Sequence, residues 1–140
     1  YLRDLESLIV ATLADLDIKA DLKEGLTGVW ANDSKLAAIG VAVSRWITYH
    51  GLALNVNTDL DYFKLINPCG ITKFPVGSVS NLLGRKLDLK AVADLMAANF
   101  VKLFNYEIEI VEDLNTIFID NTDNETYRIS LPKEEINENN

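Results

Sequence analysis

The only cysteine of this chain and a lysine upstream of it are the residues whose types and settings could do chemistry together. Cys69 lies between Pro68 and Gly70, which place it on a constrained loop, and Lys35 begins an apolar run. A thiolate can take an acyl group from a thioester and pass it to an amine, because the acyl-enzyme is itself an activated thioester. A nearby lysine can favour the thiolate when protonated and accept a proton when neutral.

Each candidate also has an ordinary structural explanation. A lone cysteine is commonly a small buried hydrophobe, and a lysine before a strand is commonly solvated. His50, the single histidine, is more often a satisfied core or loop side chain than a reactant. Taken singly, none of the three identifies a site. Their order and their surrounding motifs must do so.

Helical periodicity and capping residues predict the helices that would position these residues. Apolar positions recur at helical spacing over residues 2–16, and residues 60–63 suggest one helical turn. Ser78 can cap a short helix that ends near Gly84. Asp88 can cap a longer helix, whose apolar stripe is core rather than a cofactor site.

Turn residues and apolar runs predict the strands. Residues 29–31 and 47–57 are expected to be strands, and residues 35–43 are almost continuously apolar, which predicts a strand buried on both faces. Residues 18–23 alternate like an edge or half-buried strand. Two short β-like runs, residues 116–119 and 126–130, are joined by residues 120–124 and predict a hairpin.

Size and pattern predict one folded domain. The chain has 140 residues, of which 49% are hydrophobic, enough for one core. The expected fold class is α+β, with a mixed sheet backed by helices. We expect the domain to cover residues 1–131 and residues 132–140 to be a polar, disordered tail. Because the chain opens without methionine inside a helical pattern, we expect an N-terminally incomplete domain.

Composition narrows the class of protein further. No apolar run approaches the roughly 20 residues of a membrane span, so no membrane association is expected. One cysteine cannot form an intramolecular disulfide or a multi-thiolate metal site, so a reducing compartment is the default and no metal is expected. The cytoplasm is the predicted location, with a mitochondrion or plastid as the alternative if a leader preceded Tyr1.

Charge is unevenly distributed along the chain. The formal net charge is −8, but residues 1–106 carry 11 acidic and 11 basic side chains, whereas residues 107–140 carry 10 acidic and 2 basic ones. A basic group in residues 64–102 predicts a positive surface beside Cys69. It consists of Lys64, Lys73, Arg85, Lys86, Lys90 and Lys102. Without interleaved aromatics this surface does not indicate nucleic acid, and an acidic carrier protein is the better partner.

Four blocks in a fixed order resemble the octanoyltransferase family, also called lipoate-protein ligase B. They are Gly28-Val29-Trp30, Lys35-Leu36-Ala37-Ala38-Ile39-Gly40, His50-Gly51-Leu52-Ala53-Leu54-Asn55 and Pro68-Cys69-Gly70-Ile71. The resemblance extends more loosely to the lipoate and biotin protein ligases, which share the fold. It implies the biotin/lipoyl protein ligase (class II synthetase-like) architecture.

The resemblance also implies a reaction and a set of site residues. Cys69 would be the nucleophile that carries the acyl thioester, and Lys35 the general acid/base. The implied substrate-binding residues are His50, Gly51, Leu52, Ala53, Ala38, Ile39, Gly40 and Gly70. An octanoyl group would move from acyl carrier protein to the lysine of lipoyl domains of 2-oxoacid dehydrogenases and of the glycine cleavage H protein. The enzyme would be a monomer without cofactor.

Two departures and two alternatives accompany this resemblance. The family's upstream Arg-Gly-Gly and Thr-Tyr-His-Gly-Pro-Gly blocks are absent, so we expect the chain alone to be weakly active or inactive. The acidic segment beyond residue 107 has no functional explanation. One alternative is an ATP-dependent lipoate or biotin protein ligase relative, although no Gly-rich phosphate loop is present. The other is a non-catalytic module that binds carrier domains.

Overall fold

The computed structural model describes residues 1–65, 74–111 and 126–130. It forms two compact units, Tyr1–Met96 and Ala97–Asn140. The helix α3 (Leu89–Phe104) spans the boundary between them. All candidate site residues that the structure describes lie in the first unit.

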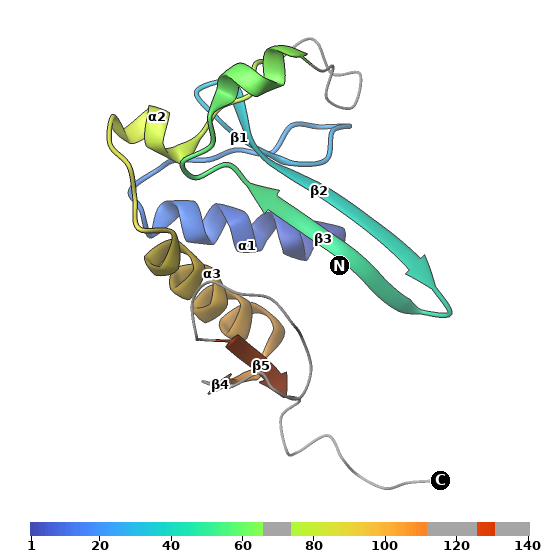
Figure 1. Cartoon of the computed structure of the whole chain (residues 1–140). Coiled ribbons are helices and arrows are strands. Elements are labelled where there is room, and N and C mark those ends of the chain that lie inside the picture. The colour runs from blue at the N-terminus through green and yellow to red at the C-terminus, as the bar shows by residue number, and fades with distance from the viewer. Residues whose placement is uncertain (66–73, 112–125, 131–140) are drawn as a thin grey trace, which may run out of the picture. The chain divides into compact units, whose positions relative to one another are not determined.

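A three-stranded antiparallel sheet, in the order β1-β2-β3, is the framework of the first unit (Figure 1). Its strands are β1 (Val29–Ala31), β2 (Ser34–Ser44) and β3 (Ile47–Leu54). Two-residue turns join them, Asn32-Asp33 and Arg45-Trp46, and all four residues have positive φ. Such backbone angles suit the right-handed twist of a tight hairpin. The sheet therefore projects as a long ribbon whose tip exposes 96% of Trp46.

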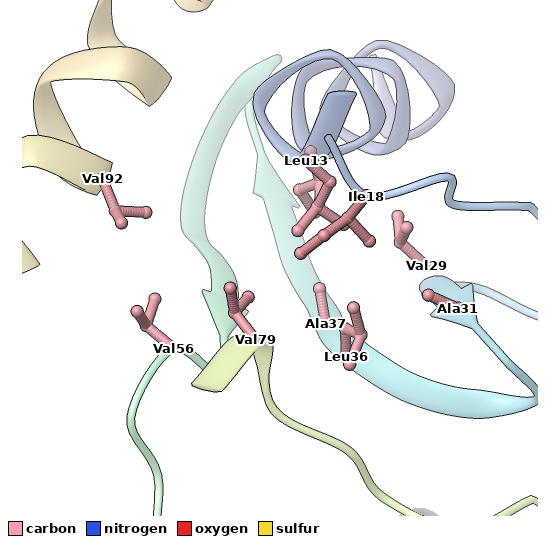
Figure 2. Close-up of a cluster of buried hydrophobic side chains, with 10 residues drawn as sticks. Leu13, Ile18, Val29, Ala31, Leu36, Ala37, Val56, Val79 and Val92 are labelled. Carbon is pink, nitrogen blue, oxygen red and sulfur yellow. The ribbon is translucent and has the colours of Figure 1, made fainter. Parts of the chain in front are cut away.

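Helix α1 (Leu2–Ala14) packs on β1 and β2 with an apolar face, as its periodicity predicts. Leu8, Ile9 and Leu13 on this face are at most 2% exposed. They extend toward a core in which side chains from distant segments meet, as Figure 2 shows. Its labelled members are Leu13, Ile18, Val29, Ala31, Leu36, Ala37, Val56, Val79 and Val92. The core thus ties the first residues of β2 to the helix.

Two short helical elements and the longer helix α3 follow the sheet. The 3-10 helix η1 (Leu60–Leu65) agrees with the predicted helical turn, and α2 is Val79–Leu83. Ser78 caps α2 by accepting a hydrogen bond from the Asn81 amide at 3.3 Å. Gly84 ends α2 with a φ of 67°. Both predicted caps are confirmed, and α3 begins one residue after Asp88, where the sequence predicts it.

The structure corrects three details of the predicted sheet. Residues 18–23 form no strand but a single bridge, Asp21 to Trp30. In β2 only Leu36 and Ala37 are fully buried, because the described residues cover one face of the ribbon and leave the rest half-buried or exposed. The named strands are all antiparallel, and parallel pairing is limited to one bridge between Lys35 and Val76. The α+β class is confirmed.

The second unit contains the end of α3 and a separate two-stranded sheet. Phe100 stacks on Phe104 and Tyr106, with ring centroids 4.5 and 5.9 Å apart. Strands β4 (Glu107–Val111) and β5 (Thr126–Ser130) pair antiparallel. β5 is the second of the two predicted hairpin strands, but it pairs with β4, which was not predicted, and the first predicted strand, residues 116–119, lies outside the described residues. The predicted tail, residues 132–140, lies outside the described residues.

The packing of α1 predicts the effect of a core truncation. We expect Leu13→Ala, at a position with 0% exposure, to lower the free energy of unfolding by about 3 kcal/mol through lost contacts and an unfilled cavity. Leu2→Ala in the same helix, at 46% exposure, should change it by less than about 1 kcal/mol. Urea denaturation measures both, and equal costs would contradict the placement of the core.

Candidate functional site

Lys35 lies between β1 and a segment that follows the cysteine loop. On one side it pairs with Trp30 of β1. On the other, its amide donates to the Pro75 carbonyl at 2.8 Å and its carbonyl accepts from the Gly77 amide at 2.9 Å. This segment begins immediately after residues 66–73, the stretch that contains Cys69. The backbone of Lys35 is therefore joined to the chain just downstream of the cysteine.

A β-bulge sets the direction of the Lys35 side chain. The register changes from Val29 opposite Ala37 to Trp30 opposite Lys35, so one residue of β2 is extra. Such a bulge breaks the alternation of side chains and re-aims those beside it. The Lys35 Nζ lies 5.3 Å from the centroid of the Trp30 ring, within cation–π range. The aliphatic part of Lys35 runs over Gly28.

Gly28 has no room for a side chain. Its φ is +140°, and a Cβ there would lie 2.6 Å from Lys35 Cε and 2.7 Å from the Ala37 carbonyl oxygen. Both distances are shorter than real Cβ contacts allow. Glycine at position 28 thus lets the backbone approach Lys35 closely.

Gly77 and Asn55 fix the segment on the other side of Lys35. A Cβ at Gly77 would lie 2.7 Å from Ser34 Cβ. The Asn55 side-chain amide donates to the Gly77 carbonyl at 3.1 Å, and its backbone amide donates to the Leu36 carbonyl at 2.9 Å. The Val79 amide donates to the Asn55 carbonyl at 2.8 Å. Asn55 therefore connects the end of β3 with both β2 and the chain before α2. The sequence matched Asn55 to a motif but did not predict these bonds.

Trp30 supplies an unused donor beside Lys35. The side chain is 1% exposed, and its Nε1 is the buried side-chain polar atom that lacks a hydrogen-bond partner among the described residues. Phe74 meets its ring edge-on, with centroids 6.3 Å apart. Buried N–H groups are generally paired, so this donor is available to a group outside the described part. The hydropathy of the sequence does not indicate that the Trp30 indole N–H would be buried without a partner.

The predicted acyl-binding residues divide between the two faces of the ribbon. Ile39 and Leu52 pair with each other and pack against the core. One cross-strand pair lies on each side of this pair along the ribbon: Ala38 with Ala53, and Gly40 with Gly51. Because successive residues of a strand alternate between its faces, these two pairs lie on the face directed away from α1. An added Cβ at Gly40 or Gly51 would meet nothing within 4 Å. Among the described residues, nothing therefore covers the outer face along these four residues.

The structure does not bring His50 to Lys35. His50 is exposed, has a φ of 69°, and pairs with Val41 six residues further along β2. At about 3.3 Å per residue, this separates the two by roughly 20 Å along the strand. The nearest ring to His50 is that of Tyr49, with centroids 4.8 Å apart.

Cys69 and Gly70 lie outside the described residues, so only the ends of their loop are placed. η1 precedes it, where Lys64 donates to Asp61 at 2.6 Å. This hydrogen bond lowers the pKa of the Asp61 carboxyl and raises the pKa of Lys64, although both side chains are largely exposed. Phe74 follows the loop and contacts Trp30. Both the loop's exit and Lys35 therefore share Trp30 as a neighbour.

Two of the six basic residues predicted to form a positive surface are paired with carboxylates. Lys64 pairs with Asp61 and Lys90 with Asp94, at 2.6 and 3.1 Å. Lys73 lies outside the described residues, and Lys102 belongs to the second unit. Arg85 and Lys86 remain exposed in the first unit. The count over residues 64–102 missed the Lys64 pair because Asp61 precedes that segment.

The described residues form neither a metal site nor a membrane-spanning helix. In the part of the chain that the structure describes, no three side chains of His, Cys, Asp or Glu gather as a metal site would require. Within the same residues, no helix has the length and apolarity needed to span a bilayer.

Comparison with known sequences finds one family over most of the chain. Residues 1–101 match the family model described as "Lipoyl protein ligase A/B catalytic domain". An octanoyltransferase of Caldanaerobacter subterraneus subsp. tengcongensis is 46% identical over 112 residues, which are 80% of this chain and 49% of the relative. An octanoyltransferase of Koribacter versatilis is 46% identical over 120 residues, 84% and 48% respectively. The chain thus spans about half the length of these curated relatives.

Solved structures with a similar fold are protein ligases. Biotin protein ligase from Aquifex aeolicus superposes with a TM-score of 0.58 at 18% identity, covering 74% of this chain and 44% of that one. A lipoate-protein ligase A bound with ATP superposes with a TM-score of 0.57 at 17% identity, covering 74% and 45%. At this identity the likeness concerns the fold alone, and it confirms the expected ligase-like architecture.

The crowding of Gly28 predicts the effect of adding one methyl group there. We expect Gly28→Ala to lower the free energy of unfolding by about 3 kcal/mol, because strain at positive φ adds to overlap with Lys35 and Ala37. Gly25→Ala is the matched control: φ is +74° and nothing lies within 4 Å, so strain alone should cost about 1 kcal/mol. Equal costs in urea denaturation would show that Gly28 and Lys35 are not in close contact.

Proposed function

This chain belongs to the lipoyl protein ligase A/B catalytic-domain family, and on that premise we propose that it carries the lysine–cysteine dyad of an octanoyltransferase. The observation that carries the proposal is the pair of hydrogen bonds from Lys35 to Pro75 and Gly77. Those bonds join the proposed acid/base lysine to a described segment that begins just after residues 66–73, the stretch that contains Cys69. An acyl group would move from a carrier protein to a lysine of a lipoyl domain.

The proposed reaction has two transfers. In the first, Lys35 takes the proton of the Cys69 thiol, and the thiolate attacks the carbonyl carbon of octanoyl-acyl carrier protein. A new thioester forms, the bond to the carrier's sulfur breaks, and Lys35 returns the proton to that departing sulfur. In the second, the ε-amine of the acceptor lysine attacks that thioester, the amide forms, and the Cys69 sulfur leaves. Lys35 takes the proton of the attacking amine and returns one to the departing sulfur, so protons balance. Backbone amides near Cys69 and Gly70 would hold the oxyanion.

The open face of the ribbon supports the proposed path of the acyl chain. Small residues at positions 38, 40, 51 and 53 form a face that no described residue covers, and this face begins three residues from Lys35. An extended hydrocarbon chain needs a smooth, apolar surface of this kind. Leu52 and Ile39 would support the surface from the core side, and His50 would lie toward its far end.

Two other functions predict different behaviour. An ATP-dependent ligase would need a nucleotide, as the solved lipoate-protein ligase A binds, and the likeness in fold does not separate the two classes. The lysine–cysteine dyad favours transfer from an already activated thioester. A module that only binds carrier domains would need neither residue. It would bind equally well after Lys35→Ala and would form no covalent adduct.

A mass measurement distinguishes these functions. Turnover by the chain alone is expected to be weak, but one attack by Cys69 suffices to form an adduct. Prolonged incubation with octanoyl-acyl carrier protein without ATP should therefore raise the intact mass of the chain by one octanoyl group, and Cys69→Ala should abolish the adduct. Lys35→Ala should slow adduct formation at least about 100-fold, the usual size of an acid/base contribution. Lys19→Ala, an exposed lysine outside the site, is the matched control. An adduct that persists in Cys69→Ala, or that requires ATP, would refute the proposal.

The open face gives a second test. We expect Gly40→Val to fold normally, since an added Cβ has free space there, but to weaken binding of the octanoyl donor about tenfold by filling the acyl path. Ser44→Val on the same face, four residues further from Lys35, should leave binding unchanged. The donor concentration at half-maximal adduct formation measures this. Equal behaviour of the two variants would place the acyl chain elsewhere.

A further inference from the structure

A buried carboxylate on α1 has no part in the reaction described above. Glu6 is 1% exposed on the helix face that carries Leu5 and Ile9. Burying a charge is costly unless it is paired and hydrogen-bonded. Glu6 is paired at both oxygens: Oε1 accepts from the Gly28 amide at 3.0 Å, and Oε2 accepts from Arg3 Nη1 at 2.5 Å.

The group that Glu6 holds lies directly beneath Lys35. Gly28 precedes β1, and its neighbour Val29 begins the register change that produces the β-bulge. A Cβ at Gly28 would lie 2.6 Å from Lys35 Cε and 3.3 Å from Lys35 Nζ. The contacts therefore run in sequence from the Glu6 carboxylate to the Gly28 backbone and then to the Lys35 side chain.

We infer that Glu6 is a positioning residue for Lys35. By accepting from the Gly28 amide, it fixes the backbone over which the lysine side chain runs and so sets the location of Nζ. Stability alone does not account for a charge here, because apolar residues of similar volume commonly stabilise a core as well as a buried ion pair does. The catalytic consequence rests on the proposed function of Lys35, whereas the effect on Lys35 placement does not.

Four variants separate hydrogen-bond geometry from charge. Glu6→Gln keeps an oxygen within reach of Gly28 but removes the charge, whereas Glu6→Asp keeps the charge and shortens the reach by one methylene. Glu6→Leu removes the acceptor and retains apolar volume, so it tests the inference independently of Glu6→Asp. Glu24→Asp, at an exposed turn residue, is the matched control.

Labelling of Lys35 measures its placement without any turnover. The folded chain is treated briefly with an amine-reactive ester, and peptide mass spectrometry gives the labelling rate of Lys35 relative to exposed Lys19. We expect Glu6→Asp and Glu6→Leu to move this ratio at least threefold toward that of a free lysine, and Glu6→Gln and Glu24→Asp to stay within twofold of the unmodified chain. The inference would be overturned if the labelling ratio stayed unchanged in Glu6→Asp or Glu6→Leu, whichever of them folds. It would also be overturned if the ratio in Glu6→Gln changed as much as in those variants.

Single-turnover formation of the octanoyl adduct adds the catalytic readout. Glu6→Asp should lower the rate constant about 10- to 100-fold, the loss that a small misplacement of a reacting group produces, without changing the half-saturating donor concentration. Glu6→Gln should keep the rate constant of the unmodified chain. Absence of any adduct in the unmodified chain would sink the proposed function and leave the labelling result standing, so the two failures are distinguishable.

Discussion

The backbone of Lys35 is held from both sides, and the arrangement of the site depends on that constraint. β1 pairs with it through Trp30, and the chain at Pro75 and Gly77 pairs with it from the opposite direction. Backbone hydrogen bonds fix position more firmly than contacts between flexible side chains, because few dihedral angles remain free to relax. A lysine with four rotatable side-chain bonds thereby obtains a fixed origin at the exit of the cysteine loop.

Close backbone approach is what makes this double pairing possible. Glycine stands on each side, at positions 28 and 77, where a methyl group would overlap Lys35 or Ser34. The bulge in β2 turns the lysine toward Gly28 while Leu36 and Ala37, next along the strand, both remain in the core. Close packing around the first residues of β2, from Ser34 to Ala37, therefore accounts for both glycines.

Apolar sequence does not by itself say which surface will be covered. The run over residues 35–43 has the hydropathy of a strand buried on both faces, yet its described surroundings bury only its first part. Val43 is 61% exposed and Ile47 is 70% exposed at the far end of the ribbon. Hydropathy records a side chain's preference for burial, and the neighbouring elements decide whether that preference is met.

The sequence by itself determined the local elements and the candidate chemistry. Helical periodicity located α1 and α3, the caps at Ser78 and Gly84 bounded α2, and the motifs selected Lys35 and Cys69, because each of these signals depends on residues close together in the chain. Only the tertiary structure decided what surrounds the lysine: the bulge, the buried bond from Gly28 to Glu6 and the pairing with Pro75 and Gly77. Those contacts join segments far apart along the chain, where the free energy of packing selects partners and local propensity carries no information about them.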